Sequence, residues 1–166
     1  CETFKNTERD PGRDLEALNR CSDYWESIRE LYYPFESGMR AWTSQVYQHE
    51  IPGGQLTNLK EQAASLGLGS RWREILRTYA DVNQLFGDIV KVTPSSKVVG
   101  DMTLYLVTNN LKAQDVLDEK RELSFPKSVV ELMEGRLGRP QGGWPKKVQQ
   151  IILKDRKTLK GRPADA

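Results

Sequence analysis

Apolar side chains recur at steps of three and four residues along most of this chain, and this spacing restricts the fold more than any other feature. Such a period places the side chains on one face of an α-helix. The clearest stripe ends at Gly87 and consists of Trp72, Ile75, Leu76, Tyr79, Val82 and Phe86. The spacing predicts helices over residues 14–33, 55–66, 71–86, 95–108, 113–117, 127–134 and 144–154. We therefore expect an all-α chain of about seven helices with one short extended connector at residues 89–92.

Polar segments mark both ends of the predicted helical region. Residues 1–12 are polar and contain the breaker Pro11-Gly12, so we expect a loop that leads into a helical region of residues 13–154. Residues 155–166 are expected to be a flexible linker without fixed structure. Residues 40–47 have weak periodicity and are expected to form a short extended piece or a loop.

Several details of the helices can also be predicted. A side-chain oxygen at the start of a helix accepts from free N–H groups of the first turn, so Asp14, Ser70, and Ser95 or Ser96 are the expected N-caps. Helices 55–66 and 71–86 are joined by a short connection, which favours an antiparallel hairpin. The apolar stripe of the first helix is expected to lie in the core; it comprises Leu15, Leu18, Cys21, Trp25, Ile28 and Tyr32.

Composition excludes several classes of protein. The chain has 166 residues, of which 37% are hydrophobic and 29% charged, as expected for one globular domain. A net charge of +2 gives no reason to expect a polyanionic partner. The two cysteines, Cys1 and Cys21, form no zinc-binding spacing and favour free thiols in a reducing compartment. No signal peptide or long apolar run is present, and the chain lacks an initiator Met, so we expect a piece of a longer protein that does not contact a membrane.

Two features have a functional and a structural interpretation. His49, beside Glu50, has the chemistry of a general base with an orienting carboxylate, but no nucleophile lies at a suitable spacing, so a hydrogen-bonded structural role is favoured.

Residues 146–162 contain seven Lys or Arg and one Asp. A basic tail can bind nucleic acid, but no aromatic residue or nucleic-acid motif accompanies it, which favours a solvated helix face.

The stretch from Asp88 to Asp101 reads as a short extended apolar run, a turn at Pro94 and a helix start. Three hydroxyl side chains gather at this helix start, where backbone N–H groups also point; they belong to Thr93, Ser95 and Ser96. Such a turn can hold an anionic or carbonyl-bearing ligand, although capping of the helix is the commoner role.

Four segments, in the same order, resemble the carboxyltransferase domain of the pyruvate carboxylase family. They are YYPFESG (32–38), VYQHEIPGGQLTNLKEQAASLGL (46–68), DIVKVTPSSKVVGDM (88–102) and ELSFPKSVVELMEGRLGRPQGGWP (122–145). The resemblance extends from about Leu15 to Pro163. Related biotin-dependent decarboxylase and transcarboxylase subunits tend to have Met at the position of Gln55 and Thr-Ser-Gln at residues 95–97, so these positions favour pyruvate carboxylase.

The resemblance implies a role for this chain. In the family, a (β/α)8 barrel is followed by a helical extension, which this chain resembles, and the enzyme moves a carboxyl group from carboxybiotin to pyruvate to make oxaloacetate. The family's threonine that relays a proton between pyruvate and biotin matches Thr93, and its serine in the biotin pocket matches Ser96. A divalent metal such as Mn or Zn is held by barrel residues, biotin sits on a carrier domain, and ATP is used by another domain; none of these parts is in this sequence. We therefore expect the chain by itself to be inactive and to hold no metal.

The same resemblance implies the partners and leaves alternatives. The partners are pyruvate, the biotin carrier domain and the parent barrel, in an enzyme that is a homotetramer; nucleic acid and membranes are not among them. The compartment would be the cytoplasm for a bacterial source or the mitochondrial matrix for a eukaryotic one. The decarboxylase or transcarboxylase branch, a non-catalytic helical interaction module and a purely structural buttress of the barrel remain as alternatives.

Overall fold

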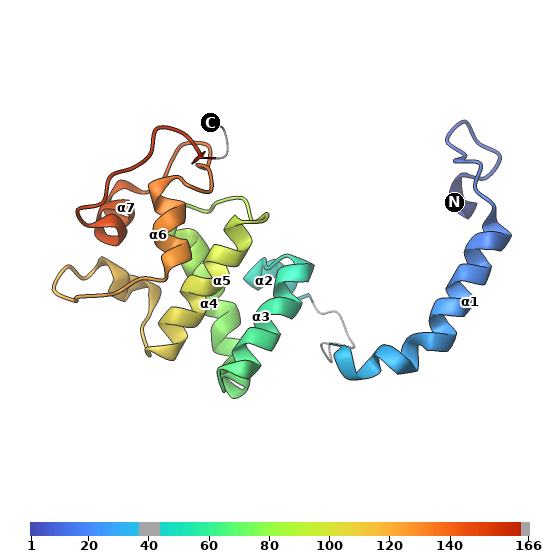
Figure 1. Cartoon of the computed structure of the whole chain (residues 1–166), viewed down its shortest axis with the longest axis horizontal. Coiled ribbons are helices and arrows are strands. Elements are labelled where there is room, and N and C mark those ends of the chain that lie inside the picture. Colours follow the sequence, from blue (N-terminus) through green and yellow to red (C-terminus); the bar gives the residue numbers. More distant parts are fainter. Residues whose placement is uncertain (37–43, 164–166) are drawn as a thin grey trace. The chain divides into compact units, whose positions relative to one another are not determined.

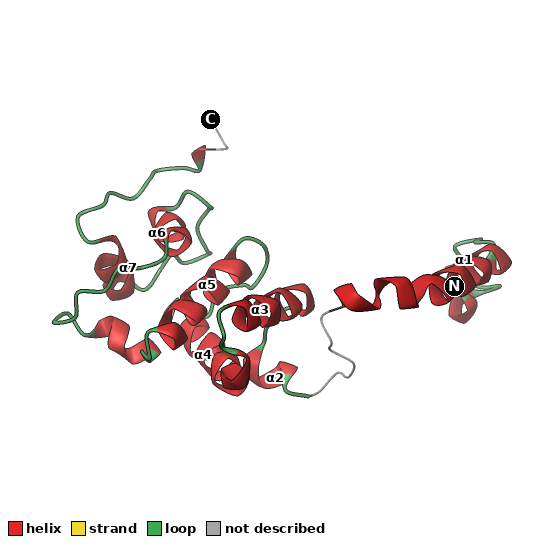
Figure 2. Cartoon of the chain, turned by 60° about the horizontal axis from the view of Figure 1, so that its bottom comes forward, coloured by secondary structure: helices red, strands yellow, loops and turns green. Residues whose placement is uncertain are grey.

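A computed structural model describes residues 1–36 and 44–163, all of which lie in helices, turns or loops (Figures 1 and 2). The described residues contain seven α-helices and no strand, which confirms the all-α prediction. The chain divides into two compact units, Cys1–Met39 and Arg40–Ala166. None of the described helices is both long and apolar enough to span a membrane. The two cysteines are free, as expected.

The first unit is built on one long helix. It contains the 3-10 helix η1 (Glu2–Phe4), α1 (Leu15–Tyr32) and the 3-10 helix η2 (Tyr33–Phe35). Asp14 caps α1 as predicted, since its carboxylate accepts from the Ala17 N–H at 3.0 Å. However, α1 has no buried residue, and Trp25 is 61% exposed. The prediction that this stripe lies in the core is therefore wrong for the chain alone, because the described residues of this unit offer no second α-helix against which the stripe could pack.

The second unit holds the remaining helices around α5. Its elements are α2 (Val46–His49), α3 (Gly53–Ser65), η3 (Gly69–Arg71), α4 (Trp72–Leu85), α5 (Ser95–Thr108), η4 (Ala113–Leu117), α6 (Lys127–Glu134) and α7 (Lys146–Leu153). Helix α5 is the most apolar and packs against α3, α4 and α6, while α7 packs against α6 and η4 (Figure 1). The core is therefore centred on the helix that begins directly after the Thr93 turn.

Helices α3 and α4 do not form the predicted hairpin, since each packs mainly against other elements, and α5 is the helix that both contact. The reason lies at Gly100 of α5, where the absent side chain lets α3 approach closely. A Cβ added at Gly100 would lie 2.7 Å from Gln55 Nε2 and 3.3 Å from Leu59 Cδ1. Leu59 is fully buried in this contact. Close approach to α5, rather than the short α3–α4 connection, therefore decides where α3 lies.

The sequence predicts the C-terminal ends of the helices better than their N-terminal caps. Gly67 ends α3 with a left-handed backbone (φ 72°), and the Leu68 N–H donates to the Ala63 carbonyl at 2.8 Å. Gly135 and Asn110 end α6 and α5 with φ 92° and 55°. The predicted serine caps are wrong: α4 and α5 begin after Arg71 and Pro94, and no side chain among the described residues caps either helix.

The segments before α3 and between α4 and α5 can also be compared with the prediction. Of the segment 40–47, predicted as an extended piece or a loop, residues 44–45 form a turn and residues 46–47 begin the short helix α2, while residues 40–43 lie outside the described part. The connector at residues 89–92 has no regular structure.

After α7, the chain returns to the end of α6, where the Leu159 N–H donates to the Glu134 carbonyl at 2.8 Å and Arg156 contacts the Glu134 carboxylate at 3.4 Å. The described residues 155–163 contain no α-helix or strand, and the flexible linker expected at residues 155–166 stays a prediction.

Candidate functional site

The turn between α4 and α5 is closed by the side chain of Ser95. Its Oγ lies 2.7 Å from the Val90 carbonyl oxygen and 2.6 Å from the Val92 carbonyl oxygen, and it accepts from the Val92 N–H at 3.2 Å. The Ser96 N–H also donates to the Val92 carbonyl, at 3.0 Å. The Thr93–Pro94 peptide bond within this turn is cis. Ser95, considered from the sequence as a helix cap or as part of a ligand-binding turn, therefore bonds backwards to the connector.

Thr93 lies at the apex of this turn and is exposed. Its hydroxyl makes no hydrogen bond within the described residues, so it does not cap α5. The neighbouring Val90 and Val92 are 77% and 60% exposed. The turn thus presents the exposed hydroxyl of Thr93, which can donate and accept a proton.

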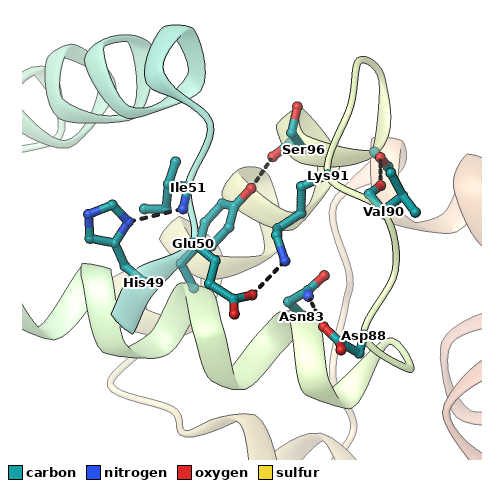
Figure 3. Close-up of polar contacts among 10 residues, drawn as sticks. His49, Glu50, Ile51, Asn83, Asp88, Val90, Lys91 and Ser96 are labelled. Atoms are coloured by element: carbon teal, nitrogen blue, oxygen red, sulfur yellow. Dashed lines mark hydrogen bonds and ion pairs between the residues drawn. The ribbon is translucent and has the colours of Figure 1, made fainter. Parts of the chain in front are cut away.

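Ser96 follows Thr93 by three positions in the sequence and is buried, at 4% exposure. The buried hydroxyl of Tyr79 on α4 donates to its backbone carbonyl at 3.1 Å (Figure 3). Burial raises the pKa of Tyr79, because the phenolate would lose its hydration, so this side chain remains a neutral donor. Tyr79 therefore fixes the first turn of α5 against α4, a role that its position in an apolar stripe did not indicate.

Two polar pairs hold the connector before Thr93 (Figure 3). Lys91, whose side chain is only 16% exposed, contacts the Glu50 carboxylate at 2.7 Å. The hydrogen bond from Lys91 lowers the pKa of Glu50. At the start of the connector, the Asn83 amide donates to Asp88 at 2.8 Å. No periodicity or spacing links Glu50 to Lys91 in the sequence, so the pair was missed.

His49 has the structural role that the sequence favoured. It is 5% exposed at the end of α2, and its Nδ1 accepts from the Ile51 N–H at 3.0 Å. Burial lowers the pKa of His49, which favours the neutral ring. Its neighbour Glu50 points to Lys91 instead (Figure 3). The pairing of base and carboxylate considered from the sequence is therefore not formed.

The side of the turn formed by Ser95 borders a groove of about 350 Å³. Val90, Val92 and Pro94 line it together with Trp144 and other residues near α6, but Thr93 does not. No group of three His, Cys, Asp or Glu side chains in the described part of the chain is placed to hold a metal ion. The site thus consists of a braced turn with one outward hydroxyl, and the described residues do not enclose that hydroxyl in a pocket with Ser96.

Comparison with known proteins identifies relatives over nearly the whole chain. A family model described as "Conserved carboxylase domain" matches residues 46–166. The pyruvate carboxylase of Bacillus subtilis (strain 168) is 50% identical over 162 residues, and the mitochondrial pyruvate carboxylase of Rattus norvegicus is 45% identical over 161 residues. These alignments cover 98% and 96% of the chain but 14% of each relative, so the chain spans about one seventh of the length of these curated relatives.

Solved structures give the same result. The carboxyl transferase domain from Rhizobium etli pyruvate carboxylase with pyruvate and biocytin is 53% identical, with a TM-score of 0.91 over 99% of this chain and 28% of that one. The complete multifunctional pyruvate carboxylase from Rhizobium etli has a TM-score of 0.90, and the match covers 15% of it. Identity and fold therefore agree over both units of the chain.

Proposed function

The chain belongs to the conserved carboxylase domain family, and from this membership we propose that it serves in the carboxyltransferase domain of a pyruvate carboxylase. The reaction would transfer a carboxyl group from carboxybiotin to pyruvate and give oxaloacetate. The observation that carries the proposal is the match, at 53% identity, to a carboxyl transferase domain with pyruvate and biocytin. The curated relatives described above are all pyruvate carboxylases, which favours this branch over the decarboxylase and transcarboxylase subunits.

Thr93 is proposed as the group that moves a proton. A hydroxyl can donate one proton and accept another through the same oxygen, so it can relay a proton without becoming a free alkoxide. A carboxylate in its place would add a negative charge beside a developing enolate. Thr93 is exposed and makes no hydrogen bond in the described part of the chain, and its branched side chain has few χ1 rotamers. These properties support a hydroxyl that is available to a bound substrate and has few orientations.

Ser96 is proposed to contribute to the biotin pocket. Biotin, when bound, supplies the carboxyl group, and hydroxyl groups are suitable partners for its polar ring. The buried Ser96 is held through its own carbonyl by Tyr79, which supports a fixed position. The described residues do not fit a metal site, so no step of this proposal uses a metal bound by this chain.

The remaining parts of the proposal concern the whole enzyme. The barrel, the biotin carrier domain and the ATP-using domain would be separate parts of the parent protein, which we propose is a homotetramer. The described residues of this chain would place Thr93 but supply no metal, so the chain alone is proposed to be inactive. Purified chain that makes oxaloacetate from pyruvate would contradict this part.

The proposal is tested by replacing Thr93 in the full-length enzyme that contains this chain. Thr93→Ala should lower oxaloacetate formation by about 100-fold or more, because positioned proton transfer contributes that much to a rate. Biotin-dependent ATP cleavage, which takes place in another domain, should persist, and Thr93→Ser should retain activity. Thr108→Ala is the matched control, since Thr108 is also exposed and lies at the other end of α5. Near-normal oxaloacetate formation by Thr93→Ala would refute the role of Thr93.

A further inference from the structure

We infer that the Ser95 hydroxyl is a positioning group for Thr93, holding the backbone that carries the Thr93 side chain in the direction that proton transfer needs. This inference rests on the proposed function. Ser95 itself would not touch the substrate; it would act only through the turn.

The geometry places Ser95 across the two residues that lead into Thr93. Its Oγ is within 2.7 Å of the carbonyl oxygens of both Val90 and Val92 and accepts from the Val92 N–H at 3.2 Å. The single hydroxyl proton can be donated to only one carbonyl at a time, but either bond joins the start of α5 to the connector. The Ser95 side chain therefore closes the turn on the side that precedes Thr93.

Packing alone cannot hold this piece of backbone. Ile89, at 6% exposure, is the last connector residue with a buried side chain, whereas Val90 and Val92 are 77% and 60% exposed. The other contacts that hold residues 90–92 are the Lys91–Glu50 ion pair and the hydrogen bond from the Ser96 N–H to the Val92 carbonyl. Ser95 is the only one of these groups that bonds on both sides of Lys91, at Val90 and at Val92.

The Ser95 side chain also takes no part in capping the N-terminus of α5. The N-cap of this helix is Pro94, and no side chain in the described part of the chain caps it, so the hydroxyl of Ser95 is not needed for the helix to begin. Loss of that hydroxyl should loosen the connector and leave the helix in place. A small displacement of a catalytic group is costly, because a shift of about 1 Å can lower a rate about 100-fold.

The experiment uses the full-length enzyme with Ser95→Ala, Ser95→Thr and a control, Ser65→Ala. Ser65 makes the same kind of bond, from its hydroxyl to the Glu61 carbonyl at 3.0 Å, on α3. Ser95→Ala should lower kcat for oxaloacetate formation about 10- to 100-fold with little change in KM for pyruvate. Ser95→Thr, which keeps the hydroxyl, and Ser65→Ala should stay close to the unchanged enzyme, and biotin-dependent ATP cleavage should persist in all. If Ser95→Ala does not fold, Ser95→Cys replaces it, since a thiol keeps the size but is a weak donor.

A double-mutant cycle separates positioning from a general structural role. If Ser95 acts through Thr93, Ser95→Ala should cause no further loss of kcat in an enzyme that already carries Thr93→Ala. Additive losses, or a normal kcat for Ser95→Ala, would overturn this inference while the loss in Thr93→Ala still supported the proposed function. Near-normal activity of Thr93→Ala would instead overturn the proposed function, and this inference with it.

Discussion

The Tyr79 hydroxyl donates a hydrogen bond of 3.1 Å to the backbone carbonyl of Ser96, and this bond joins the middle of α4 to the first turn of α5. Both residues are buried, at 0% and 4% exposure. The bond crosses the most extensive helix–helix contact of the second unit, beside the turn that carries Thr93. It thus couples the core of the fold to the candidate site.

Tyr79→Phe should lower the free energy of unfolding by about 1 kcal/mol, because it removes one buried hydrogen bond while the ring keeps its packing. The measurement is urea unfolding of the chain, with the midpoint and slope compared between variants. Tyr105→Phe on α5 is the matched control, since Tyr105 is half-buried and contacts the ring of Phe125 without a hydroxyl hydrogen bond in the described residues. Equal effects of the two substitutions would show that the bond to Ser96 contributes nothing.

Gly100→Ala should destabilise the chain by about 1 kcal/mol, although alanine favours a helix more than glycine does. The added methyl group would lie 2.7 Å from Gln55 Nε2 and 3.3 Å from Leu59 Cδ1, so the Gln55 side chain would have to turn away and the buried Leu59 side chain would have to shift. Gly54→Ala is the control, because no atom lies within 4 Å of the added carbon there. It should be neutral or stabilising in the same urea measurement, and a stabilising Gly100→Ala would contradict the close approach of the two helices.

The Glu50–Lys91 pair should make stability depend on pH. The pKa of Glu50 lies below its ordinary value of 4.5 in the folded chain, so the carboxylate binds a proton less readily there than in the unfolded chain. Its contribution is therefore complete above the unfolded-state pKa and is lost as the pH falls through the lowered folded-state value. Glu50→Gln should remove this part of the acid dependence in urea unfolding.

Glu61→Gln serves as the control for Glu50→Gln. Glu61 lies on α3, and its carboxylate makes no ion pair within the described residues. Its substitution should leave the pH profile unchanged. If Glu50→Gln and the unchanged chain lose stability in parallel over the acid range, the pair does not contribute to folding.

Glu134→Gln should loosen the segment after α7. The Glu134 carboxylate, 8% exposed, pairs with Arg136 at 2.6 Å and with Arg156 at 3.4 Å, and a neutral amide would lose most of this attraction. Trypsin should then cleave after Lys157 or Lys160 several times faster, which mass spectrometry of timed digests would detect. Glu119→Gln is the control, because Glu119 pairs with Lys147 at 3.6 Å in an exposed position. An unchanged rate in Glu134→Gln would mean that the backbone bond of Leu159 suffices to hold the segment.

Much of the fold could be predicted because it depends on local rules. The stripe in α4 and the left-handed residues Gly67, Asn110 and Gly135 fix where helices lie and end, and the structure confirms them. The errors came from contacts between residues far apart in the sequence. The predicted hairpin is not formed because α3 packs onto α5, where Gly100 leaves room for Gln55 and Leu59. A single glycine in a helical stretch does not indicate such a contact between helices.

The candidate site, too, could be predicted from the sequence only in part. The hydroxyl-rich turn was visible from the sequence, but the direction of each hydroxyl was not, since a serine at a helix start can bond forwards to the helix or backwards to the connector. Ser95 bonds backwards. Lys91 and Glu50 are 41 residues apart, and only the tertiary structure brings them together. The roles of Thr93 and Ser96 in catalysis stay predictions.

The absence of any buried residue in α1 has a consequence for the tolerance of this chain to mutation. Leu59 and Met102 are buried against other residues of this chain. A substitution of either residue would therefore change the free energy of unfolding measured on these 166 residues. A polar residue in place of Trp25 or Tyr32 would leave such an experiment almost unchanged, because these side chains are 61% and 55% exposed. The same substitution becomes harmful only where another surface covers α1. Measurements on the chain alone would therefore classify the α1 stripe as dispensable, and selection on its sequence would be visible only in the assembled protein.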